Sequence, residues 1–225
     1  CGRFTNQYSW RELYELYSLT DQDMIPSNFQ PRYNIAPTQS VPVVRLKNGG
    51  RDLVMMRWGL VPSFAKDLSG GAKSINARGE TVADKPMFKS AFLRRRCLVP
   101  ADGFYEWKKE GNAKQPYFIT LRQKAPFAFA GLWEWWRPRD GSAEILTFTI
   151  ITTAANALVA PLHDRMPVIL APDAWPLWLA EKPVSPGQLQ GLLKAFAPEK
   201  MESWPVSTKV NKPENDDPGL VQKPG

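Results

Sequence analysis

Histidine and cysteine are scarce in this sequence. Its 225 residues contain one histidine, His163, and two cysteines, Cys1 and Cys97. Two cysteines cannot form the framework of several bridges that stabilises small secreted domains, so we expect reduced thiols, with Cys97 buried in the core. These few residues also cannot supply a self-contained zinc site of the usual ligand type and spacing, and we predict neither a metal nor a cofactor.

Long apolar runs are absent as well. No stretch of the sequence approaches the ~20 apolar residues that cross a bilayer, so we expect no association with a membrane. The opening residues, CGRFTNQYSW, have no apolar segment of the kind that a secretory signal requires.

Prolines and tryptophans, by contrast, are abundant: the chain has 21 of the first and nine of the second. Proline interrupts helices and central strands, which favours short strands joined by many loops. We expect most tryptophans to fill the core, but some to offer flat faces on which nucleobases stack. The net charge of +7, together with the surplus of aromatic residues, favours nucleic acid over a membrane surface as the partner.

Local patterns predict a single α+β domain over residues 1–225, with mostly antiparallel strands. Ser9 and Glu12 form a capping box before the first predicted helix, and Lys47 to Gly50 is a hairpin turn signal. Helices do not alternate regularly with strands, which disfavours a doubly wound parallel sheet. Helices are predicted at residues 9–19, 80–96 (with Pro86 as a break), 173–180 and 186–197. Strands are predicted at residues 41–46, 53–58, 97–99, 103–107, 117–121, 127–133, 146–153 and 168–170. Residues 25–42 read as an ordered loop, and residues 211–225 as a partly mobile tail.

Cys1 is the first candidate for chemistry. If residue 1 is the mature amino terminus, it carries an α-amine and a thiol on adjacent carbons. An aldehyde reacts with both groups, because the amine forms an imine and the thiol then closes a five-membered thiazolidine ring on the same carbon. Unperturbed α-amines have a pKa of ~7.7–8.0, so part of the amine is neutral near pH 7. The alternative is that the numbering starts here for an unrelated reason.

His163 and Glu106 are the candidate proton-transfer groups. His163 lies in the loop sequence PLHDRMP beside Asp164 and Arg165, and loops of this kind often carry site residues. Glu106 alternates with Phe104 in a predicted strand and faces inward if Phe104 does. A shift of register at Gly103 would instead place Glu106 in solvent, and the pattern leaves both interpretations open.

Seven segments resemble one known family when they are taken together and in order. They are CGRF, RYNIAPTQ, WGLVPSFAKD, INARGET, CLVPADGFYEWK, ITTAAN and LHDRMPVIL. From Cys1 to about Asp217 the chain is similar to the SOS-response-associated peptidase (SRAP) family. The resemblance implies a barrel-like core of mostly antiparallel sheets with peripheral helices.

The resemblance also implies a function. A member of this family would sense abasic sites in single-stranded DNA and link to them covalently through a thiazolidine at Cys1, which shields the lesion. Asn76 would hold the cysteine and the adduct, Glu106 would transfer protons, and His163 would assist sugar ring opening. A lyase side reaction and self-removal of a leading methionine are further implications. The chain would act as a monomer, in the cytoplasm with the nucleoid of a bacterium or in a eukaryotic nucleus.

Six residues match family positions that contact DNA. The residues that would lie near backbone phosphates are Arg3, Arg78 and Arg165. Those that would pack against bases are Pro37, Trp107 and Phe64. At residue 64 the family commonly has tryptophan, and this chain has phenylalanine. The smaller ring has less area for stacking, so we expect weaker DNA affinity with the chemistry retained.

Two other functions remain open from the sequence. A cysteine peptidase could use Cys1 and His163 as a thiolate–imidazolium pair, although no local protease signature supports it. A non-catalytic module could bind single-stranded DNA through charge and aromatic stacking alone, and its binding would then disappear in high salt.

Overall fold

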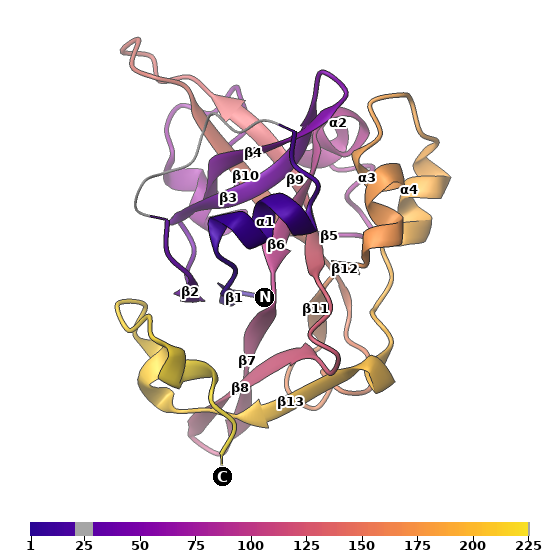
Figure 1. Ribbon diagram of the computed structural model, residues 1–225. Coiled ribbons are helices and arrows are strands. Elements are labelled where there is room, and N and C mark those ends of the chain that lie inside the picture. The colour runs from indigo at the N-terminus through magenta and orange to yellow at the C-terminus, as the bar shows by residue number, and fades with distance from the viewer. Residues whose placement is uncertain (21–28, 225) are drawn as a thin grey trace.

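Five strands close into a barrel at the centre of the fold (Figure 1). The computed structural model describes residues 1–20 and 29–224. In the barrel the strand order is β10-β4-β3-β6-β9, and β9 pairs back with β10. Only the β4–β10 pairing among these five is parallel, which confirms the expected mostly antiparallel, barrel-like α+β fold. The strands are β3 (Ser40–Lys47), β4 (Gly50–Trp58), β6 (Arg96–Ala101), β9 (Phe127–Trp136) and β10 (Ile145–Ala154).

A second, antiparallel sheet has the order β13-β8-β7-β1-β2. Its strands come from both ends of the chain and from the middle: β1 (Phe4–Asn6), β2 (Arg32–Ile35), β7 (Gly103–Glu110), β8 (Ala113–Leu121) and β13 (Met201–Pro205). The amino-terminal residues thereby pair with β7, since Phe4 lies opposite Phe104. This pairing holds residues 1–3 in place, although chain ends commonly fray.

Three short strands extend the barrel sheet. β5 (Asn76–Arg78) and β11 (Arg165–Pro167) both pair with β10, and β12 (Ile169–Leu170) pairs with β9. Thr152 of β10 pairs with Arg78 of β5 and with Pro167 of β11, so two segments 89 residues apart in sequence (167 − 78) meet there.

In the described part of the chain, four α-helices lie around the barrel: α1 (Trp10–Leu16), α2 (Pro86–Arg94), α3 (Trp175–Leu179) and α4 (Pro186–Leu192). The predicted capping box before α1 is present in full. Pro86 does not break a longer helix but begins α2, where its missing N–H costs nothing. The predictions for residues 80–96 and 186–197 were therefore too long, because local pattern does not define where a helix ends.

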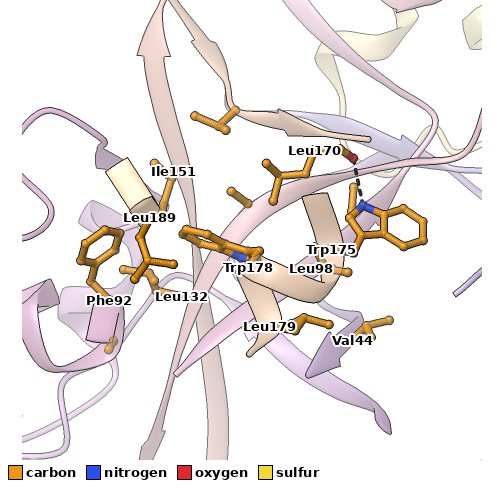
Figure 2. Close-up of a cluster of buried hydrophobic side chains, with 14 of the residues drawn as sticks. Val44, Phe92, Leu98, Leu132, Ile151, Leu170, Trp175, Trp178, Leu179 and Leu189 are labelled. Atoms are coloured by element: carbon orange, nitrogen blue, oxygen red, sulfur yellow. Dashed lines mark hydrogen bonds between the residues drawn. The ribbon is translucent and has the colours of Figure 1, made fainter. Parts of the chain in front are cut away.

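Buried side chains form two large clusters. One fills the space between the barrel and the helices, where Trp175 and Trp178 pack among leucines and Phe92 (Figure 2). Their indole nitrogens donate to the carbonyl oxygens of Leu170 and Cys97. The other cluster includes Cys97, whose burial raises the pKa of its thiol and confirms the predicted core position.

The structure differs from the sequence prediction in its edge strands. Residues 32–35, interpreted as part of a loop, form β2, while residues 25–28 of that predicted loop lie outside the described residues. The sequence analysis also missed β1, β5, β11 and β13. These strands are only three to five residues long, too short for an alternation to be detected, and each exists because of a partner that is distant in sequence.

The C-terminal segment packs against the second sheet rather than forming a free tail. Leu220 is 1% exposed, and Asp216 accepts hydrogen bonds from the backbone N–H groups of Tyr33 and Asn34. The segment predicted as a partly mobile tail is therefore anchored as far as residue 221, and Gly225 lies outside the described residues. Among the helices described, none is long and apolar enough to cross a membrane.

Candidate functional site

A pocket of ≈ 590 Å³ lies where the second sheet meets the edge of the barrel sheet. Six of the residues selected from the sequence line this pocket: Cys1, Arg3, Asn76, Glu106, Trp107 and His163. The other lining residues are Gly2, Ile75, Lys114 and Asn211. The six selected residues come from the segment before β1, from β5 and β7, and from the loop before β11, so the fold gathers residues that are separated by up to 162 positions in the chain.

Cys1 is held at all of its polar groups. Its amino nitrogen lies 3.4 Å from Glu106 Oε1, and its carbonyl oxygen accepts a hydrogen bond of 2.8 Å from Asn76 Nδ2. Its thiol donates to the carbonyl oxygen of Arg3 at 3.6 Å. The side chain is buried although it borders the pocket. An amine and a thiol are thus fixed side by side at a cavity.

Glu106 faces inward, so the solvent-exposed alternative left open by the sequence does not apply. The residue is 6% exposed and lies two positions after Phe104 in β7, which is fully buried. Its Oε1 has no hydrogen-bond partner among the described residues, although it lies near the Cys1 nitrogen. A buried carboxylate oxygen with spare acceptor capacity beside an amine is suited to taking and returning a proton.

Asn76 reaches the site because β5 pairs in parallel with β10. Its amide nitrogen holds the Cys1 carbonyl, whereas its Oδ1 is buried and has no hydrogen-bond partner in the part of the chain described. An unsatisfied buried acceptor costs free energy unless a ligand or water completes it. Asn76 and Glu106 together therefore leave two acceptors at the pocket for a hydroxyl or amine.

His163 is positioned by the loop between β10 and β11. Asn156 organises this loop, since its Oδ1 accepts from the N–H groups of Leu158 and Val159. His163 Nδ1 accepts a hydrogen bond of 3.0 Å from the backbone N–H of Arg165. In the other tautomer the same nitrogen can donate instead, to the Arg165 carbonyl oxygen or to Asp164 Oδ1, each 3.2 Å away. Sequence reasoning missed the role of Asn156, although it lies in the segment ITTAAN.

Arg3 and Trp107 form one side of the pocket. The Arg3 guanidinium lies 5.8 Å from the Trp107 ring centroid and donates to Asn34 Oδ1 and to the Val210 carbonyl, each at 2.7 Å. Burial lowers the pKa of Arg3 from its usual value. These acceptors are neutral, so the arginine keeps a net positive charge beside the pocket even though it is not a free surface arginine.

Four predicted DNA contacts do not line the pocket: Pro37, Phe64, Arg78 and Arg165. Arg165 donates to both carboxylate oxygens of Glu80, at 2.7 and 2.8 Å. Phe64 is 78% exposed, and Arg78 is also exposed. The structure therefore places these four residues outside the pocket that the other six line.

Four further pocket residues were not selected from the sequence, and two of them, Lys114 and Asn211, carry polar side chains. Lys114 lies in β8, opposite Lys109 of β7, and nothing in the local pattern distinguishes one lysine of this hairpin from the other. Asn211 belongs to the segment that was predicted to be mobile. Within the described residues, no group of three or more His, Cys, Asp or Glu side chains is arranged to hold a metal ion.

The chain is similar to known proteins over nearly its whole length. The family model of the SOS response associated peptidase (SRAP) matches residues 1–213. The abasic site processing protein YoaM of Bacillus subtilis is 42% identical over 222 residues, covering 98% of this chain and 97% of that protein. The abasic site processing protein YedK of Escherichia coli is 32% identical over 225 residues, with 99% of each chain covered.

A crystal structure of a protein from Bacteroides thetaiotaomicron superposes with a TM-score of 0.90 at 28% identity and covers all of both chains. The match of the family model over nearly the whole chain, together with the relatives of more than 30% identity, shows that this chain belongs to the SRAP family.

Proposed function

We propose that this protein processes abasic sites in single-stranded DNA by forming a covalent thiazolidine with the ring-opened sugar. The observation that carries the proposal is the fixed position of the Cys1 amine beside Glu106, with the Cys1 thiol on the adjacent carbon. The names of the relatives, which are abasic site processing proteins, support the same substrate class. A single copy of the chain lines the pocket, so a monomer is sufficient.

The proposed chemistry starts at the nitrogen. Glu106 accepts a proton from the Cys1 ammonium, and the neutral amine attacks the aldehyde carbon of the open sugar. The carbinolamine loses its hydroxyl as water, with the proton returned by Glu106, which gives a protonated imine. Glu106 then takes the N–H proton and leaves a neutral imine. The thiol sulfur then bonds to the imine carbon while its proton passes to the nitrogen. The balance is one aldehyde and one aminothiol giving one thiazolidine and one water.

Two neighbours would assist these steps. Asn76 fixes the Cys1 carbonyl and so keeps the nitrogen and sulfur oriented to the same carbon. His163, which lines the pocket, would protonate the ring oxygen as the sugar opens. Closure of the thiazolidine removes the imine, and an imine left open would allow β-elimination and a strand break. Action on DNA would place the protein at the nucleoid of a bacterium or in a eukaryotic nucleus.

A denaturing gel tests the proposal. The protein is mixed with a single-stranded oligonucleotide that carries one abasic site, and a slower band that survives denaturant and high salt is expected. The matched controls are the undamaged strand and the same abasic strand reduced with borohydride, which has no aldehyde. A band of equal intensity with the reduced strand, or no band with the abasic strand, would overturn the proposal.

The alternatives predict different results. A non-catalytic binding module would give a complex that denaturant and salt remove. A peptidase would turn over a protein substrate through a Cys1–His163 pair. In the described residues no hydrogen bond joins these two side chains, because the thiol donates to the Arg3 carbonyl.

Lys114 is expected to contact a phosphate of the bound strand. Replacing it with glutamine should weaken binding of the single strand and reduce the slope of log K against log salt by about 0.7, the value for one phosphate contact on a single strand. Fluorescence anisotropy over a series of salt concentrations measures this slope. Lys109→Gln is the matched control, because Lys109 lies opposite Lys114 in the hairpin but does not line the pocket. Equal slopes for both variants would contradict the assignment.

Phe64 is expected to stack on a base near the lesion. Its ring is 78% exposed, so a larger ring can be added without repacking. Phe64→Trp should tighten binding of the abasic strand roughly two- to fivefold, since base–aromatic stacking contributes ~1–3 kcal/mol per base. Leu93→Trp, at an exposed apolar position on α2, controls for non-specific stacking. Affinity of the Phe64→Trp variant equal to or below that of the wild type would refute the prediction.

A further inference from the structure

The segment from residue 207 to residue 217, which we call the C-terminal strap, forms one wall of the pocket through Asn211. It belongs to neither sheet, and includes only the short 3-10 helix η4 (Thr208–Asn211). In Figure 1 this segment is coloured yellow and lies beside the ends of β1 and β2. Its position must therefore be determined by side-chain contacts.

Two residues anchor the C-terminal strap to β2. Asp216 forms an ion pair with Arg32 and accepts hydrogen bonds from the backbone N–H groups of Tyr33 and Asn34. Asn34 is fully buried, and its Nδ2 lies within hydrogen-bond distance of the carbonyl oxygens of Val210, Lys212 and Asn215, at 3.2, 3.1 and 2.7 Å. A buried amide that satisfies several backbone carbonyls fixes the segment as a unit.

The anchored strap in turn contacts the pocket side chains. Asn211 Oδ1 accepts a hydrogen bond of 2.7 Å from Trp107 Nε1, and the Val210 carbonyl accepts one from Arg3. The Arg3 guanidinium lies over the Trp107 ring. The indole is half-buried, with one edge fixed by Asn211 and one face near Arg3.

We infer that Asn211 is a positioning residue that fixes the indole of Trp107 for stacking against the nucleobase next to the abasic sugar. This inference rests on the proposed function. A side chain that is already fixed in its bound orientation loses less conformational entropy on binding, so the hydrogen bond strengthens the complex without touching the reacting atoms. The C-terminal strap is then part of the recognition surface for the strand.

Asn211→Leu tests this role, since leucine is similar in size but cannot accept the indole N–H. Adduct formation is followed under single-turnover conditions at increasing protein concentration. The protein concentration that gives half-maximal rate is expected to rise about three- to tenfold, which corresponds to the loss of one hydrogen bond. The maximal rate of adduct formation should stay unchanged, because Asn211 does not touch the reacting atoms. Asn112→Leu, the same substitution at an exposed asparagine in the β7–β8 turn, should behave as the wild type.

A double-mutant cycle establishes whether Asn211 acts through Trp107. In the Trp107→Phe background, which has no indole N–H, Asn211→Leu should cause no further loss. An unchanged half-saturating concentration in Asn211→Leu, an equal loss in Asn112→Leu, or full additivity in the double mutant would each overturn the inference.

A measurement without DNA separates this inference from the proposed function. The indole N–H signal of Trp107 is identified in a ¹H–¹⁵N spectrum by its disappearance in Trp107→Phe. It should shift in Asn211→Leu and stay in place in Asn112→Leu. If the wild type forms no adduct while this shift occurs, the proposed function fails and the contact still stands. If the signal does not shift, the positioning role fails whatever the adduct assay shows.

Discussion

Replacing Cys1 with alanine is expected to abolish the denaturation-resistant adduct with an abasic strand, because the thiol that closes the thiazolidine is removed. The alanine amine remains beside Glu106, so a reversible imine can still form. Its product should be visible on a gel only after trapping with borohydride. Strand cleavage should increase at the same time, since an imine that is not captured by sulfur undergoes β-elimination.

Two controls limit the interpretation of this result. Cys97→Ala removes the other thiol, which is fully buried, and should leave the adduct intact. Acetylation of the Cys1 nitrogen removes the other nucleophile and should eliminate both the stable adduct and the trapped imine. A stable adduct of wild-type yield from Cys1→Ala or from the acetylated protein would refute the assignment of the reacting groups.

Glu106→Gln is expected to slow adduct formation by ~10²–10⁴-fold, the usual contribution of a positioned proton-transfer group. The amide has the same shape and keeps a hydrogen bond within reach of the Cys1 nitrogen, but it cannot accept a proton from the ammonium. The rate constant under single-turnover conditions, measured at saturating protein, reports this step without the contribution of binding.

Glu110→Gln is the matched control for this substitution. Glu110 lies in the same strand as Glu106, four residues further on, but is exposed and pairs with Lys108 at 3.5 Å. We expect the Glu110→Gln variant to form the adduct at a rate within a factor of about two of the wild type, since exposed ion pairs contribute little to stability. A Glu106→Gln rate as fast as that of Glu110→Gln would show that another group transfers the proton.

Several parts of this protein follow from local sequence. The capping box at Ser9 defines the start of α1, and the turn at Asn48 and Gly49 defines the β3–β4 hairpin, because both depend on neighbouring residues only. The juxtaposed amine and thiol of Cys1 are likewise a property of one residue. The resemblance of seven ordered segments to the SRAP family predicted the barrel and named six of the residues that line the pocket. The predicted fold and family are confirmed.

The arrangement of the site was decided by contacts between distant parts of the chain. Alternation in a strand defines two faces of β7, but only its position between β1 and β8 buries Glu106. The sequence likewise could not show that Arg3 donates to Asn34 and Val210, or that Asn211 lines the pocket. The sequence by itself determined the local turns and singled out Cys1 as the residue proposed to react, because both need only covalent neighbours. The tertiary structure alone decided which face is buried and which side chains meet, because pairing between strands and burial depend on the whole chain.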